Sequence, residues 1–254
     1  MKTLFLSRWH QILAVPLSVL LMGTGLLFSA AASAQIAGTA HDFSDGVSGG
    51  AGADGWNTSG EICVVCHAPH NTIETAEQGG TGSLGPLWNR TLSAVNNYSV
   101  YSSTGRAGSF LEPSTVASQS TDPSGVSKLC LSCHDGTIAL DSFGRAGDGT
   151  PFTAGTTTID GVSVNFNIGE GSGLNGNLSN DHPVAFTFPI TDSEIYTFTA
   201  GFVDGPNPGV LPLFGGLTDQ LECATCHDVH GTGNAKLLRV ANAGSDLCLS
   251  CHIK

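Results

Sequence analysis

The eight cysteines of this 254-residue chain form four pairs that share one spacing. In each pair two residues separate the cysteines, and a histidine follows the second cysteine directly. The four motifs are Cys63–Cys66–His67, Cys130–Cys133–His134, Cys223–Cys226–His227 and Cys248–Cys251–His252. No cysteine is left over, so whatever these motifs bind constrains the fold at four points along the chain.

The Cys-x-x-Cys-His spacing is typical of covalent haem c attachment. Cysteines three apart lie on one side of a helical turn, where each thiol can form a thioether with one of the two haem vinyl groups. The adjacent histidine then directs its imidazole at the iron from the same side. The four motifs therefore predict four covalently attached haem c groups. Zinc sites with four cysteine ligands and thioredoxin-like pairs are the alternatives, but neither requires a histidine after every pair.

Residues 1–34 have the features of a cleaved export signal. Two basic residues precede a mostly apolar run over 12–28, and Ala32-Ser33-Ala34 has the small-x-small form of a signal-peptidase site. The apolar run is short for a membrane-spanning helix. We therefore expect a signal peptide over 1–34, a secreted tetrahaem domain over 35–254, and no membrane insertion after cleavage.

The expected mature chain is strongly acidic. Two of the nine Lys and Arg residues lie in the first 34 positions and none of the 21 Asp and Glu residues does, so a formal charge of −14 remains. Such a surface disfavours nucleic acid and anionic lipid and is compatible with cationic partners or metal ions. The chain is rich in Gly, Ser, Thr and Asn, which indicates that side chains alone do not fill the core.

The remaining histidines match the number of second axial ligands that four irons need. Both methionines, Met1 and Met22, lie in the expected signal, so no iron can take a His/Met pair. The expected mature chain has four histidines outside the motifs: His41, His70, His182 and His230. We expect them to complete a bis-histidine set. The alternatives are a surface or hydrogen-bonded role for one of them, with Lys128, Lys236 or a tyrosine at one haem.

Two of these histidines follow a motif histidine by three residues. A residue one helical turn after His67 leaves from the same side of the haem, so His70 can hardly reach the far face of that iron. We therefore expect His70 to ligate a different haem close by. His230 lies three residues after His227, so we expect it likewise to ligate a different haem.

The sequence predicts a mostly irregular, loop-rich fold with short helices at the haem motifs and a few short β-strands. A longer helical stretch is expected around residues 86–97, and a hairpin over 156–166. Short strands are expected at 184–190 and 195–203. Three arginines are candidates for pairing with haem propionates or for the solvated surface: Arg90, Arg106 and Arg145.

Five phrases carry a family resemblance: GEICVVCHAPHN (60–71), GPLWNR (85–90), KLCLSCHDGTIALDSFG (128–144), NDHPVAF (180–186) and ECATCHDVHG (222–231). They resemble secreted multihaem c-type cytochromes of metal-reducing, electroactive microbes. The chain is most similar to the tetrahaem group that polymerises into extracellular filaments, the cytochrome nanowires.

That resemblance implies a core built around a stack of bis-histidine haems. It also implies a homopolymer in which a histidine of one subunit, here the candidate His70, ligates a haem of its neighbour. The implied function is extracellular electron transfer to other redox cytochromes, metal oxides or electrodes, and not catalysis. A discrete periplasmic or outer-surface electron shuttle is the alternative. A multihaem reductase needs an iron with a vacant or Lys-ligated position, which the histidine count disfavours.

Overall fold

The computed structural model describes eight parts of the chain: residues 36–44, 57, 60–68, 87–101, 119–144, 177–179, 181–231 and 233–254. The chain divides into two units, Met1–Ser33 and Ala34–Lys254, and every described residue lies in the second. No helix in the described ranges is long and apolar enough to cross a membrane.

Several predictions made from the sequence fall outside the described residues. They are the export signal over 1–34, the hairpin over 156–166, the ligand role of His70, and the propionate or surface roles of Arg106 and Arg145. These remain predictions.

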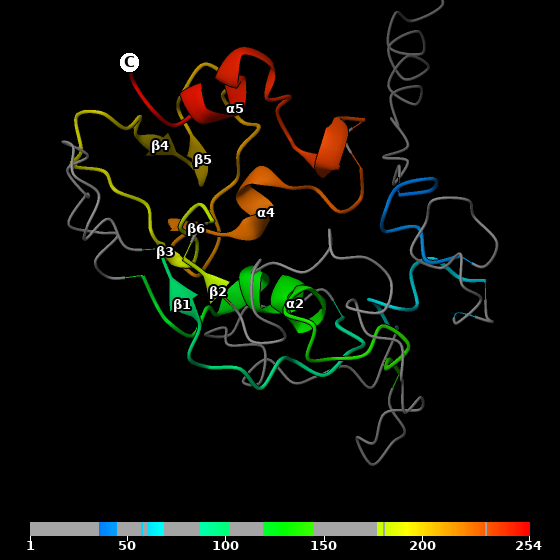
Figure 1. The fold of residues 1–254 in the computed structure, drawn as a ribbon. Coiled ribbons are helices and arrows are strands. Elements are labelled where there is room, and N and C mark those ends of the chain that lie inside the picture. The colour runs from blue at the N-terminus through cyan, green and yellow to red at the C-terminus, as the bar shows by residue number, and fades with distance from the viewer. Residues whose placement is uncertain are drawn as a thin grey trace, which may run out of the picture. The chain divides into compact units, whose positions relative to one another are not determined.

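Regular structure in the described ranges is limited to short elements joined by turns and loops (Figure 1). The helices are α2 (Gly125–His134), α4 (Cys223–Cys226) and α5 (Asp246–Leu249), with 3-10 turns η2 (Ala235–Leu237) and η3 (Ala243–Ser245). The two-residue strands are β1 (Ser99–Val100), β2 (Asn177–Leu178), β3 (Phe186–Thr187), β4 (Phe198–Thr199), β5 (Phe202–Val203) and β6 (Gln220–Leu221). The prediction of a loop-rich fold with a few short helices and strands is confirmed.

Three of the four motifs lie on these helices. α2 ends on His134, α4 runs between the two cysteines of the third motif, and α5 contains Cys248. The first motif forms a turn over 62–66, and the backbone N–H of His67 donates to the carbonyl of Cys63 at 2.8 Å. That bond spans four residues, as in a single α-helical turn. All four motifs thus place two cysteines and a histidine on about one turn.

The strands form three separate two-stranded pairs. β1 pairs with β2 in parallel, β3 pairs with β6 antiparallel, and β4 pairs with β5 antiparallel. β4 and β5 form a hairpin, and its two turn residues, Ala200 and Gly201, have φ of 52° and 80°. A two-residue turn with both residues in the left-handed region matches the twist of the flanking strands. The predicted strands at 184–190 and 195–203 contain β3, β4 and β5.

The helix expected around residues 86–97 is wrong, because residues 87–97 are irregular. Leu87 has a φ of 55°, which a right-handed helix does not allow. The backbone N–H of Asn89 donates to the carbonyl of Cys66, and that of Ser93 donates to Oγ of Ser132. Tertiary hydrogen bonds to the first motif and to α2 therefore override the local helix propensity.

Arg90 lies in the same irregular segment and is only 1 % exposed. Its Nη1 donates to the carbonyl of Leu140 and its Nη2 to the carbonyl of Ala139, both at 2.7 Å. The solvated surface role suggested for Arg90 is therefore wrong. The guanidinium instead ties the segment after the first motif to the turns that follow α2.

The apolar side chains form three small clusters. The largest contains Phe186, Phe188, Val203, Leu211, Leu213 and Leu221, and Cys251 packs against it. A second contains Tyr98, Leu131 and Leu178, and a third pairs Trp88 with Leu129 beside Cys66. Two motif cysteines, Cys66 and Cys251, thus border apolar clusters, and no cluster extends across the whole described chain.

Candidate functional site

The structure brings the described histidines together in pairs, and each pair joins a motif histidine to a histidine outside the motifs. The ring centroids of His134 and His41 are 5.9 Å apart. Those of His67 and His230 are 6.2 Å apart, and those of His252 and His182 are 6.5 Å apart. The pairs include every described histidine except His227.

These separations fit one iron between two imidazoles. A bond between a metal and an imidazole nitrogen is about 2 Å long, and the ring centroid lies about 1 Å behind that nitrogen. Two imidazoles on opposite faces of one iron therefore have centroids roughly 6 Å apart. Ordinary aromatic pairs also fall within about 4.5–7 Å, so a single pair would be unspecific. Three such pairs, each of which joins one motif histidine to one histidine outside the motifs, indicate axial ligation much more specifically than a single pair does.

The pairing of His230 follows the prediction that this residue leaves its own motif. Its ring faces His67 of the first motif, although it lies three residues after His227. His41 and His182 are likewise brought to the second and fourth motifs. Their roles as iron ligands stay predictions, and the geometry supports them.

Backbone carbonyls orient two of the imidazoles. Nδ1 of His182 donates to the carbonyl of Pro183 at 2.9 Å, and Nδ1 of His227 donates to the carbonyl of Lys236 at 2.9 Å. A proton held on Nδ1 leaves the Nε2 lone pair free to bind a metal. Lys236, a candidate ligand in the sequence, therefore acts here through its main chain by orienting His227.

Burial favours the neutral imidazole, which is the form that binds iron. Desolvation, followed by the neighbouring His134 and His227, lowers the pKa of His41 to about 4. Desolvation, followed by His182, lowers the pKa of His252. Both imidazoles are neutral at physiological pH, so neither must lose a proton before ligation.

None of the eight motif cysteines forms a disulfide bond. Burial raises the pKa of Cys66 to about 12, that of Cys251 to about 12 and that of Cys226 to about 11. Burial therefore favours the neutral thiol at these three cysteines. Across the described residues, no group of three or more His, Cys, Asp or Glu side chains converges as a metal site. The described cysteines thus lie in pairs and not in a four-ligand zinc cluster, an arrangement that fits thioether formation.

A family model described as "Doubled CXXCH motif" matches residues 216–254, which contain the third and fourth motifs. A comparison with curated proteins found no match for the chain. The first and second motifs repeat the same spacing, and a histidine pair lies at three of the four motifs. The doubled motif and the four cysteine pairs support a multihaem c-type cytochrome. Four cysteine pairs in this cytochrome are consistent with four haem c groups.

A buried carboxyl joins the second and third motifs of the cytochrome. Glu222 is 4 % exposed and accepts hydrogen bonds from the backbone N–H and the hydroxyl of Ser127, which lies on α2. The N–H of Cys223, the first residue of α4, donates to Oγ of Ser127 at 3.0 Å. Desolvation raises the pKa of Glu222 to about 7, although the Ser127 bonds oppose that effect.

Two buried acidic residues were not predicted from the sequence: Glu222, and Asp135, which is fully buried at the end of α2. A signal for both was available, because each acidic residue adjoins a motif directly: Glu222 precedes Cys223 and Asp135 follows His134. An acidic residue next to a haem attachment motif is a natural candidate for tuning that haem. The sequence does not show that both carboxyl groups are buried.

Proposed function

We propose that this cytochrome is an extracellular electron carrier whose copies polymerise into a conductive filament. Such a filament would deliver respiratory electrons to extracellular acceptors such as metal oxides or electrodes. The observation that carries the electron-transfer part is the set of three histidine pairs, each with one motif histidine. When bound, haem c supplies one-electron exchange between ferric and ferrous iron.

The chain supplies two thiols and two imidazoles for each of four haems. The first haem takes Cys63, Cys66, His67 and His230. The second takes Cys130, Cys133, His134 and His41. The third takes Cys223, Cys226, His227 and His70, and the fourth takes Cys248, Cys251, His252 and His182.

Imidazole on both faces of an iron leaves no position for a substrate or for water. This is why the histidine pairs support electron transfer over a reductase, which needs an open or exchangeable position. Histidine on both faces also gives a lower potential than ligation by histidine and methionine. The cysteines of the chain would thus attach each haem, and its histidines would occupy both axial positions of the iron.

The filament part of the proposal rests on His227 and on the family resemblance. His227 is exposed, and the carbonyl of Lys236 orients its ring with Nε2 free. In the described ranges no other histidine forms a ring pair with His227. By count, His70 is the remaining ligand, and we propose that it comes from a neighbouring copy. Polymerisation would then complete the third site.

Electron microscopy of secreted material tests the filament directly, with His70→Ala as the decisive variant. We expect filaments from the wild type, and secreted monomers with four attached haems from His70→Ala. Wild-type material containing only monomers or small oligomers would rule out the filament and leave a discrete periplasmic or outer-surface shuttle. Filaments that persist in His70→Ala would place His70 within its own chain.

A further inference from the structure

Two motifs are followed directly by an aspartate, Asp135 after His134 and Asp228 after His227. The first and fourth motifs are followed by Ala68 and Ile253 instead. The two aspartates occupy equivalent positions along the motif, but their surroundings differ in burial and in the presence of a cation.

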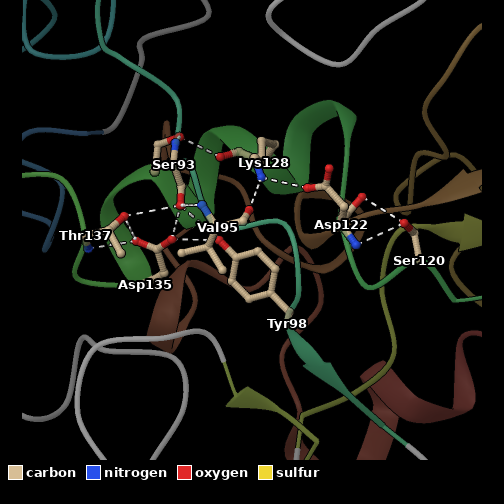
Figure 2. A network of polar contacts seen from close by, with 9 residues as sticks. Ser93, Val95, Tyr98, Ser120, Asp122, Lys128, Asp135 and Thr137 are labelled. Carbon is tan, nitrogen blue, oxygen red and sulfur yellow. Dashed lines mark hydrogen bonds and ion pairs between the residues drawn. The ribbon is translucent and has the colours of Figure 1, made fainter.

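Asp135 is fully buried and is held by uncharged donors (Figure 2). Its carboxylate accepts hydrogen bonds from the Tyr98 hydroxyl at 2.6 Å, from the backbone N–H and hydroxyl of Thr137 at 2.9 and 2.7 Å, and from the Ser93 hydroxyl. These donors satisfy its oxygens without cancelling its charge.

No cation neutralises Asp135 within the part of the chain that the structure describes. Lys128 lies on the same helix, but its Nζ donates to the carbonyl of Val95 and forms an ion pair with Asp122 at 2.8 Å (Figure 2). The same Nζ lies 5.6 Å from the centroid of the Tyr98 ring. Burial raises the pKa of the Tyr98 phenol, so this group stays protonated and donates to the carboxylate.

Asp228 is both paired and partly hydrated. Its carboxylate lies 3.2 Å from Nη1 of Arg239, and the Asp228 side chain is 25 % exposed. The guanidinium is also fixed by donation from Nε to the carbonyl of Ala224 at 2.8 Å. The charge of Asp228 is therefore compensated by Arg239 and screened by water.

We infer that Asp135 sets the reduction potential of the haem held by the second motif and makes it lower than that of the third-motif haem. Reduction adds one electron to the iron and breaks no bond. It therefore adds a negative charge to the haem whose motif directly precedes this buried carboxylate, which no cation of the described residues neutralises. Charges interact more strongly where water is excluded, so this carboxylate favours ferric iron. The inference rests on the second motif carrying a haem.

Spectroelectrochemical titration of the purified four-haem protein tests the inference with Asp135→Asn. We expect one of the four one-electron steps to move to higher potential. At a fixed applied potential, the ratio of ferrous to ferric iron in that haem should rise at least tenfold. That change corresponds to about 59 mV for one electron. Asp228→Asn is the matched control. It should shift the potential of the third-motif haem by less than half of the shift that Asp135→Asn produces. Unchanged steps in Asp135→Asn, or an equal shift in Asp228→Asn, would overturn the inference.

Tyr98→Phe keeps the test decisive if Asp135→Asn does not fold. It removes one donor from the carboxylate and retains the ring beside Lys128, so the same step should move to lower potential. A step that moves upward or stays in place in Tyr98→Phe would contradict the role of Asp135. Intact mass and thermal unfolding of each variant separate these outcomes from lost haem or lost packing. A missing haem would challenge the proposed cofactor set, whereas four haems with unmoved potentials would reject only this inference.

Discussion

At the residue scale, His230 shows that a histidine close to one motif in sequence can lie opposite the histidine of another motif. It lies three residues after His227, yet its ring lies 6.2 Å from that of His67, which is 163 positions earlier in the chain. A spacing of about one helical turn from His227 predicts that His230 ligates the haem of another motif. It does not predict which motif His230 reaches, because that depends on the path of the loops between them.

Replacing His230 with alanine should leave one iron without its second imidazole. We expect His230→Ala to bind four haems, with one of them converted from low-spin to high-spin ferric iron. The neighbouring Val229 is partly exposed and provides the control, so Val229→Ala should keep all four haems low-spin. Optical and electron paramagnetic resonance spectra measure the change. A spectrum of His230→Ala identical to the wild type would exclude His230 as a ligand.

Glu222 predicts a pH dependence of stability. Its pKa rises from 4.5 to about 7 on folding, chiefly through desolvation, so the folded chain keeps a proton that the unfolded chain loses. Stability should therefore fall as the pH rises from about 4.5 to about 7 and stay level above that range. A shift of this size is worth up to about 3 kcal/mol.

Denaturant unfolding of wild type and Glu222→Gln at pH 5 and pH 8 measures this contribution. The glutamine keeps the size of the side chain and does not ionise. We expect the wild type to lose more free energy of unfolding than Glu222→Gln between the two pH values. Equal losses in both proteins would show that Glu222 is not a buried acid.

At the element scale, the sequence predicts the motif turns well and the connecting segments poorly. The spacing Cys-x-x-Cys-His requires about one helical turn, and each motif contains one. Residues 87–97 look helical by composition, but their polar groups bond to the first motif and to α2. Such long-range bonds are not visible in a local pattern.

Arg90 should be a major structural contact between these elements. Arg90→Met keeps much of the aliphatic volume but leaves the carbonyls of Ala139 and Leu140 without their donors. Each buried group left unsatisfied costs about 1–3 kcal/mol, so we expect the two together to cost roughly 2–6 kcal/mol. Thermal unfolding of the haem-loaded protein measures it.

Lys236→Met is the control for Arg90→Met, because it removes a positive charge from an exposed side chain. Its unfolding midpoint should stay close to that of the wild type. If the two variants lower the midpoint equally, the buried bonds of Arg90 contribute little and the net charge accounts for the loss.

At the scale of the whole molecule, the sequence predicts the number of iron ligands, and the structure shows which histidines lie opposite one another. Eight motif cysteines, four motif histidines and four further histidines follow from counting the expected mature chain over 35–254. That His41 meets His134, and His182 meets His252, follows only from the fold. The small separate clusters of apolar side chains are consistent with a core that side chains alone do not fill.

The most direct test of the account is the spin state of every iron in the assembled wild-type protein, measured together with haem content per chain. Low-temperature electron paramagnetic resonance of the oxidised protein, calibrated by intact mass, provides both. The account predicts four haems per chain, all low-spin and ligated by two imidazoles. A high-spin ferric signal in the intact assembly, or fewer than four haems per chain, would contradict it.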